Sequence, residues 1–448
     1  MNRLFNILRT KKNDSQKLCT DTKMYSALSE WCDLYENKKG ADGISRSLNL
    51  ASAVSSELAR LVTVEFESKV TGGNRAKYLD AQYQRVVRKA RLFTEYACAK
   101  GGVVLKPYFE NGNIYTSIIQ PESFCPTAFT SDGEICGAIF SETFFQDGVY
   151  YTRIEEHKTE DGCCIITNKA YKSKDKDTLQ TQIPIQSVGK WKDIEPYCRI
   201  ENIKRPLFVY FKMPMANATG TLSPLGVSVF SGACDLIRDA YSQYSNLLWE
   251  FESGKRALYL DECAVRHDED GNALLPEKRL YRMLTTDNDA LFEDWSPNIR
   301  EENILRGLDR ILKSIEFNCG LAYGTLSDTQ HFDKTAEEIK ASKQRSYSTV
   351  CDIQAALKKA LCELLEIMDL YCDIYKTSPK EEYFVNFSFD DSIICDENEE
   401  FSQRLLLVGQ GIIAPWEMRM WYLGEDEDTA RKKTQEMSDK FAKGETVT

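Results

Sequence analysis

The sequence predicts an α+β fold, because helical and strand patterns fill separate stretches of the chain. Both ends of the chain carry apolar residues at i, i+3 and i+4 spacing, which is typical of amphipathic helices. The region from Val103 to Phe211 instead shows short apolar runs between turn dipeptides, which indicates strands. A third observation is one very long helical pattern that ends near Tyr375 and contains neither proline nor glycine.

Three helices are expected before the strand region. Apolar residues recur at helical spacing from Thr22 to Glu36, from Ile44 to Leu61 and from Arg75 to Ala97. Lys100-Gly101-Gly102 then ends the helical pattern, because two successive glycines are poor helix formers.

The strand region is expected to form an antiparallel meander. Its apolar or alternating runs lie at residues 103–109, 113–119, 134–145, 148–158 and 163–173. The runs are separated by Asn-Gly or Asp-Gly pairs, which are strong signals for tight hairpins. These pairs are Asn111-Gly112, Asp132-Gly133, Asp147-Gly148 and Asp161-Gly162.

Two further helices flank a compact insert. Ser223-Pro224 offers a serine N-cap and a proline at the first helical position, so a helix is expected from there until Ser253-Gly254 ends it. A second helix is expected from Glu301 to Cys319, with Gly320 at its end. Residues 256–297 lie between them and contain two short strand-like runs. These runs are Ala257–Tyr259 and Leu280–Leu284.

The long helical pattern begins with a capping box made by Thr335 and Glu338. About forty residues of helix would span roughly 60 Å, which is longer than a typical single domain is wide. The stretch from Gln344 to Thr349 is polar on nearly every face, so we expect it to meet a polar environment or another subunit. After the helix, a strand is expected at 383–389 and helices near 400–409, 415–424 and 426–443.

Composition limits the classes of protein that fit. The 448 residues suggest about two to four domains. The net charge of −12 disfavours a protein that grips duplex DNA tightly through its phosphates. No apolar run approaches the length of a transmembrane helix, so no membrane association is expected. The 15 cysteines show no C-x-x-C pair, which is typical of reduced thiols in a cytoplasm-like compartment.

Motifs for catalysis, cofactors and metals are missing from the sequence. The chain has no P-loop, no G-x-S-x-G and no H-E-x-x-H. The histidines His157, His267 and His331 lack metal-ligand spacing and are expected to be solvated. A metal-dependent enzyme acting on nucleic acid remains an alternative, with Asp426 and Asp428 as candidate ligands. A scaffold or adaptor protein without a channel is a second alternative.

The order of these parts resembles the portal proteins of tailed double-stranded DNA bacteriophages, of the siphophage type. The clearest local match is a K-T-A-x-E-[IV] signature followed by a polar stretch and Y-x-T. Lys334, Thr335, Ala336, Glu338, Ile339, Tyr347 and Thr349 stand at its positions. Further segments are similar to the family at the start of the strand region, on its surface and before the helix pair. These are 99–108, 121–126, 133–135 and 223–226.

The resemblance implies the division of a portal subunit, with an antiparallel β-rich wing, long stem helices, a small α/β clip and a helical crown. The wing would be residues 1–222, with strands from about 103, and the long wing helix 335–375. The stem helices would be 223–255 and 301–323, the clip 256–300, the tunnel loop 324–334, and the crown with the C-terminal tail 376–448.

The resemblance also implies a structural role without enzymatic activity or cofactor. Portal subunits form a ring, usually of twelve copies, at one capsid vertex of the virion after assembly in the host cytoplasm. Double-stranded DNA passes through the ring non-specifically during packaging and ejection. Expected partners are the terminase large subunit, head–tail connector or adaptor proteins, and the major capsid and scaffolding proteins.

The tunnel loop and the basic residues beside it are the candidate site toward DNA. Polar side chains at the loop tip could touch phosphates weakly, and the nearby cations could form basic rings. The alternative for the cations is intersubunit salt bridges with acidic neighbours. The candidate residues are Thr329, Gln330, His331, Lys334, Lys340, Lys343 and Arg345.

Overall fold

The computed structural model has an α+β fold, as predicted. It describes residues 4, 22–38, 47–160, 162–203, 205–221, 223–254, 257–261, 281–284, 292–295, 298–327, 336–389 and 397–442. The chain divides into two units, Met1–Ser388 and Phe389–Thr448.

In the described part of the chain, four helices precede the large sheets. They are α2 (Thr22–Tyr35), α3 (Leu50–Val62), α4 (Asn74–Val87) and α5 (Ala90–Lys100). The prediction of one helix from Arg75 to Ala97 was wrong, because the backbone turns at Lys89, whose φ and ψ are −103° and 7°. The break lets α4 pack against a strand and α5 against α3. Gly101 ends α5 in the left-handed region, with φ of 84°.

The predicted antiparallel strands are present, but they are divided between two sheets. A three-stranded sheet has the order β10-β2-β3, and a six-stranded sheet has the order β4-β5-β6-β7-β8 with β9 paired to β7. Pro121–Ser123 forms a 3₁₀ turn between β3 and β4, and the chain passes from one sheet to the other there. The strands are β2 (Gly102–Glu110), β3 (Asn113–Ile119), β4 (Phe124–Phe129), β5 (Ile135–Gln146), β6 (Val149–Glu160), β7 (Cys163–Ser173), β8 (Thr181–Ile183), β9 (Tyr197–Glu201) and β10 (Val209–Lys212).

Two hairpins have the turn chemistry that the sequence indicates. Asn111 and Gly112 have φ of 48° and 76°, and Asp147 and Gly148 have φ of 51° and 77°. Positive φ at both central positions is the mark of the type I′ turn, which matches the twist of the strands. The Asn-Gly and Asp-Gly pairs therefore set the registers of β2–β3 and β5–β6.

A separate two-stranded sheet joins distant parts of the chain. β1 (Glu67–Gly72) pairs antiparallel with β14 (Tyr383–Ser388), with Glu67 opposite Ser388. The strand at β14 was predicted, but β1 was not. The pairing makes residues up to 388 part of the first unit, and the C-terminal unit begins at Phe389.

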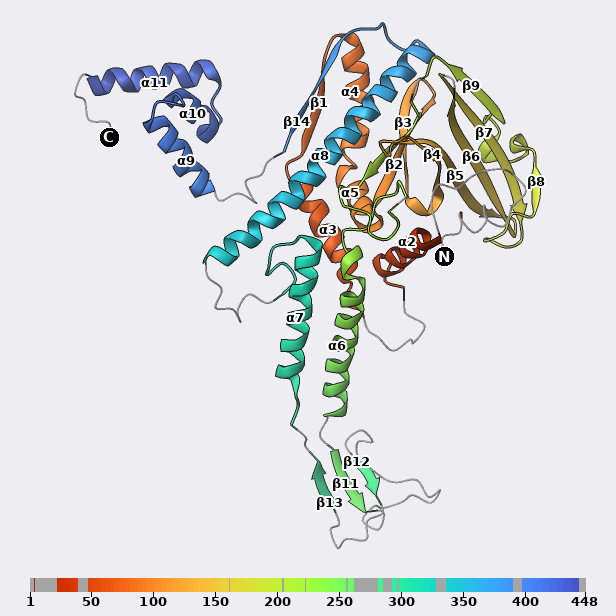
Figure 1. The fold of residues 1–448 in the computed structure, drawn as a ribbon, viewed down its shortest axis with the longest axis vertical. Coiled ribbons are helices and arrows are strands. Elements are labelled where there is room, and N and C mark those ends of the chain that lie inside the picture. Colours follow the sequence, from red (N-terminus) through yellow and green to blue (C-terminus); the bar gives the residue numbers. More distant parts are fainter. Residues whose placement is uncertain are drawn as a thin grey trace. The chain divides into compact units, whose positions relative to one another are not determined.

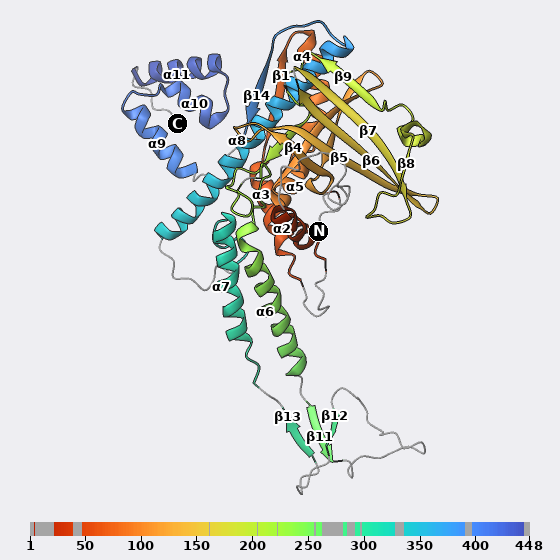
Figure 2. The ribbon, with the colours of Figure 1, turned by 45° about the vertical axis from the view of Figure 1, so that its right-hand side comes forward.

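Two antiparallel helices run side by side in both views (Figure 1 and Figure 2). α7 (Glu301–Cys319) has the predicted bounds, and Gly320 ends it with φ of 70°. α6 (Cys234–Ser253) begins eleven residues later than the predicted start at Ser223, so that part of the prediction was wrong. Between them the structure describes three strands in the order β12-β11-β13. They are β11 (Ala257–Asp261), β12 (Tyr281–Leu284) and β13 (Phe292–Trp295), the last of which was not predicted.

The late start of α6 has a packing cause. Residues 223–230 run along α5 and β10 without forming a helix; the Val229 amide donates to the Cys98 carbonyl (2.9 Å) and the Gly226 amide to the Tyr210 hydroxyl (3.0 Å). A Cβ on Gly226 would lie 2.0 Å from the Gly101 carbonyl oxygen, so the two glycine backbones approach closely. These tertiary contacts outweigh the capping signal of Ser223-Pro224.

α8 (Ala336–Tyr375) is a single helix of 40 residues, as predicted, although Thr335 of the capping box lies outside the described residues. Its predicted apolar stripe is buried from Val350 to Tyr371, against α3, α4, β2 and β10. The Tyr371 hydroxyl donates to the Pro107 carbonyl on β2 (3.3 Å). One turn later, Tyr375 stacks on Phe109 with ring centroids 3.8 Å apart.

Arg75, the second residue of α4, fixes the C-terminal end of α8. Its guanidinium is fully buried and donates to the Asp369 carboxylate (2.6 Å), the Asp373 carboxylate (2.6 Å) and the backbone carbonyls of Asp369 (2.6 Å) and Ser378 (2.9 Å). The Glu381 carboxylate accepts from the Arg75 amide (3.2 Å). One side chain thus ties α4, the end of α8 and the approach to β14 together.

The C-terminal unit contains α9 (Glu397–Gly409), α10 (Pro415–Leu423) and α11 (Glu427–Ala442), near the predicted positions. Among its described side chains, Ala430 is the one that is buried. Cation–π contacts take the place of a larger core. The guanidinium of Arg404 lies 4.3 Å from the Trp421 ring, and that of Arg431 lies 4.3 Å from the Trp416 ring.

Replacing Arg75 with methionine should lower the free energy of unfolding by about 3 kcal/mol, because two carboxylates and two carbonyls lose their buried donor. Urea unfolding followed by circular dichroism measures this loss. Arg88→Met in the same region is the matched control, since Arg88 is exposed, and it should change stability by less than about 0.5 kcal/mol. Equal effects of the two substitutions would contradict the role of Arg75.

Candidate functional site

The segment that leads into the predicted tunnel loop is held by one buried carboxylate. Glu316, in the last turn of α7, is fully buried. Its Oε1 accepts hydrogen bonds from the amides of Gly324 (3.1 Å), Leu326 (2.6 Å) and Ser327 (2.9 Å), and its Oε2 accepts from the Ser327 hydroxyl (2.9 Å). Hydrogen bonds to an ionised acceptor are the strong ones. Glu316 therefore fixes the path of residues 324–327.

The end of α7 also packs directly against the first half of α8. A Cβ on Gly320 would lie 2.5 Å from Thr349 Oγ1, so a side chain at position 320 would not fit. The guanidinium of Arg345 lies over the Phe317 ring, 4.2 Å from its centroid. Gly320, with its left-handed φ, thus lets the two helices approach at the point where the chain leaves α7.

The predicted site residues fall partly outside the described part of the chain. Thr329, Gln330, His331 and Lys334 lie outside it, and of Lys340 the structure describes the helical backbone. Lys343 is exposed on α8. Arg345 is half-buried against Phe317 of its own chain, a contact that neither the basic ring nor the intersubunit salt bridge included.

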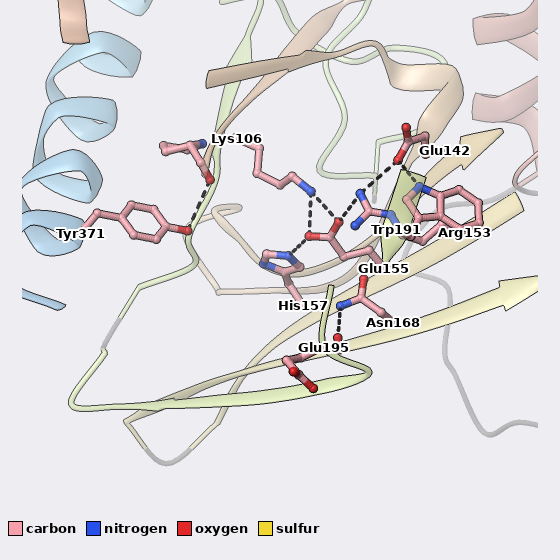
Figure 3. A network of polar contacts seen from close by, with 10 residues as sticks. Lys106, Glu142, Arg153, Glu155, His157, Asn168, Trp191, Glu195 and Tyr371 are labelled. Carbon is pink, nitrogen blue, oxygen red and sulfur yellow. Dashed lines mark hydrogen bonds and ion pairs between the residues drawn. The ribbon is translucent and has the colours of Figure 1, made fainter. Parts of the chain in front are cut away.

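A second polar cluster, which sequence reasoning missed, lies where the two large sheets meet (Figure 3). Lys106 on β2 donates to both carboxylate oxygens of Glu155 on β6 (2.7 and 2.6 Å). His157 Nε2 lies 2.6 Å from the same carboxylate, and Arg153 lies 3.2 Å from it. A lysine in a strand facing a glutamate 49 residues away leaves no local signal in the sequence.

Charge balance explains why this cluster is stable. Burial favours the neutral carboxyl, but Lys106, His157 and Arg153 outweigh it and hold the pKa of Glu155 well below its usual range. Burial lowers the pKa of His157, which is 3% exposed, so the prediction of a solvated histidine was wrong there. The Glu155 carboxylate is paired on both oxygens, which makes it a structural link between sheets, whereas Arg153 Nε and His157 Nδ1 are buried without a hydrogen-bond partner among the described residues.

The same link continues from the sheets to a 3₁₀ turn at residues 189–191. Glu142 on β5 lies 3.2 Å from the Arg153 guanidinium and accepts from Trp191 Nε1 (3.1 Å). Trp191 is buried beside Phe144. A cavity of about 550 Å³ borders the cluster, lined among others by Lys106, Glu142 and Glu155, whose charges are already paired.

The acidic run near the C-terminus has a local structural role. The Asp426 carboxylate accepts from the Thr429 amide (3.1 Å) at the start of α11, as an N-cap does. Glu425 pairs with Arg419 (3.1 Å) and Lys433 (2.5 Å). Among the described residues, no group of three or more His, Cys, Asp or Glu side chains could hold a metal ion. None of the described helices is long and apolar enough to span a membrane.

Comparison with known proteins identifies the class. The family model described as phage portal protein, SPP1 Gp6-like, matches residues 47–440. The chain is therefore a portal protein, a class of structural proteins. It belongs to the SPP1 Gp6-like family, because the match covers far more than half of its 448 residues.

Comparisons with curated proteins and with solved structures do not narrow the family further. No curated protein matches the chain. Among solved structures, one titled "Neck of native GTA particle computed with C12 symmetry" is similar over 93% of this chain and 98% of that chain, with 9% sequence identity and a TM-score of 0.40.

Replacing Glu316 with glutamine should loosen residues 324–327, because a neutral amide accepts more weakly and presents donors to other donors. Hydrogen exchange of the amides at 324, 326 and 327 should become on the order of tenfold faster or more, equivalent to about 1.4 kcal/mol. Glu302→Gln, at an exposed position of the same helix, should leave these amides unchanged. Unchanged exchange in both variants would refute the role of Glu316.

Stability should depend on Glu155 in a specific pH window. Its pKa is depressed in the folded state, so its contribution is complete above the unfolded value of about 4.3 and disappears as pH falls toward the folded value. At pH 7, Glu155→Gln should cost about 3 kcal/mol, because Lys106 and Arg153 lose a buried partner. Urea unfolding of both proteins from pH 7 to pH 3 measures the difference, which should stay constant to about pH 5 and then shrink. A difference that grows below pH 5 would contradict this assignment.

Proposed function

We propose that copies of this chain assemble into a closed ring of twelve at one vertex of a phage capsid, with a central channel for double-stranded DNA. The family match over residues 47–440 is the observation that carries the proposal. The antiparallel pair α6 and α7, joined through an insert of strands, supports it as a wall that could be repeated around a channel.

The proposal assigns a task to each part of the chain. α6 and α7 form the stem, and residues 256–300 form the clip, where the terminase large subunit docks during packaging and the head–tail connector proteins dock later. The remainder of residues 1–388, apart from the tunnel loop 324–334, forms the wing, which meets the major capsid and scaffolding proteins. Residues 389–448 form the crown. Assembly takes place in the host cytoplasm, and the ring stays in the virion.

Weak contact with DNA suits such a channel. A protein that neutralises many phosphates binds duplex DNA tightly, and a channel that did so would oppose sliding. The net charge of −12 is consistent with low adhesion. We assign the DNA contact to the loop 324–334, through Thr329, Gln330 and His331, with Lys334, Lys340 and Lys343 nearby. Arg345 is assigned to holding α8 on α7, because it stacks on Phe317.

The proposal is tested by imaging and by packaging. The purified chain should form rings in negative stain, and deletion of Thr329–His331 should leave those rings intact while DNA packaging or retention falls. Glu316 anchors the loop base outside the deletion, so the fold of 324–327 should persist. Monomers at high concentration, without rings, would refute the channel and favour a scaffold. Loss of rings on deletion would refute the assignment of the loop.

A further inference from the structure

The helix pair α6 and α7 has two outer faces of different composition. The two helices bury Ile237, Ala240 and Leu247 on α6, and Leu308 and Ile315 on α7. On each helix, one set of exposed positions opposite the buried face follows i, i+3 and i+4 steps and forms a stripe along the helix. The α6 stripe is Asp235, Asp239, Ser242, Asn246 and Trp249, and the α7 stripe is Asn303, Arg306, Arg310 and Ser314, ending before Phe317, which Arg345 of α8 covers in part.

The stripes carry opposite charges. On α6, Asp235 is paired with Arg238 (2.9 Å), whereas no hydrogen bond or ion pair within the described residues engages the Asp239 side chain. On α7, the side chains of Arg306 and Arg310 are likewise exposed and have no such partner within the described part of the chain. Trp249 is 62% exposed at one end of the α6 stripe. The α6 stripe therefore carries a carboxylate without an ion-pair partner among the described residues and an exposed apolar ring, and the α7 stripe carries two such unpaired guanidinium groups.

Two contacts, one at each end of the pair, fix the position of α7 relative to α6 along the common helix axis; this position is called height below. At one end Arg300 donates to the Glu250 carboxylate (3.0 Å), and at the other a Cβ on Gly232 would lie 3.7 Å from Asn318 Oδ1. Between these two contacts the chain advances by 18 positions on each helix, from Gly232 to Glu250 and from Arg300 to Asn318. Counting seven residues in from Gly232 and from Asn318 reaches Asp239 and Ile311, so Asp239 and Arg310 differ in height by about 1.5 Å.

Asp239 and Arg310 therefore lie at the same level on different outer stripes of the pair. In a ring whose axis runs parallel to the two helices, rotation from one copy to the next keeps each residue at the same position along that axis, so the α6 stripe of one copy can face the α7 stripe of the next. A closed ring of identical subunits needs two different, complementary faces on each subunit. The opposite charges of Asp239 and Arg310 at one height meet that requirement. DNA is a poorer partner for the α6 stripe, because its phosphates would be repelled by the acidic side chains.

We propose that the outer stripe of α6 docks against the outer stripe of α7 in a second copy of this chain, with Asp239 paired to Arg310 of the next copy. This proposal rests on the proposed ring and names the contact within it. The contact is heterologous, so every copy uses Asp239 on one side and Arg310 on the other. Arg306 and Trp249 flank the ion pair on the two stripes.

Charge reversal tests the pairing. Asp239→Arg and Arg310→Asp each place like charges at every interface, so each variant alone should require at least tenfold higher concentration to form rings. The double variant on one chain should restore assembly to within threefold of the unchanged protein, because each interface regains opposite charges. Glu252→Arg on α6 and Arg88→Asp just after α4 are exposed controls of the same chemistry, and they should assemble normally.

Mixing the two single variants gives a second readout that does not depend on the double variant. When copies of the two variants alternate, each interface joins either the two introduced side chains or the two original ones, so opposite charges meet at every contact. An equimolar mixture should therefore form rings that neither variant forms alone. Alternation closes without a mismatch when the number of copies is even, as in a ring of twelve. Light scattering after size exclusion and negative stain measure the ring fraction, and circular dichroism checks that each variant is folded.

The outcomes separate this inference from the proposed function. If the unchanged chain forms no ring, the proposed function fails. If it forms rings and the reversals have no effect, or if neither the double variant nor the mixture restores assembly, the pairing is overturned while the ring stands. Rings that form normally with Arg310→Asp but package less DNA would also overturn it, by assigning the basic stripe to DNA.

Discussion

The clamp of Arg75 on the end of α8 is the interaction on which the first unit most depends. Helices in proteins are stable mainly through packing, and a helix of 40 residues needs attachment along its length. The Arg75 guanidinium satisfies four oxygen acceptors around the last turns of α8 and the segment that follows. Because α3, α4, β2 and β10 all contact α8, fixing its end also fixes their positions.

The sequence was most informative where structure is local. Bounds for α7, β3 and β7 agreed with prediction, because glycine stops, apolar periodicity and Asn-Gly or Asp-Gly turns act within a few residues. It failed where the partner is far away in the chain. β1 pairs with β14 more than 300 residues later, and the segment before α6 is held by Gly101 and Tyr210.

The candidate site shows the same division. The sequence placed a loop between α7 and α8, and the residues described there do leave α7 at Gly320. It gave no sign that Glu316 would turn inward and accept four hydrogen bonds, since glutamate in an amphipathic helix ordinarily faces water. The same holds for Lys106 and Glu155, because an internal ion pair is specified by sheet packing and not by spacing.

Both ends of α7 are held by carboxylates, and this bears on assembly. At its start, Glu250 of α6 accepts from Arg300, and at its end Glu316 holds the following loop. The first contact sets the height of α7 against α6, and the second sets where the chain turns toward α8. A ring closes when the same small rotation is repeated at every contact, so an error in helix height would accumulate around it. Fixed helix ends thus let the two outer stripes meet in one register, and Glu316 holds residues 324–327, the base of the loop proposed to contact DNA, from within the chain.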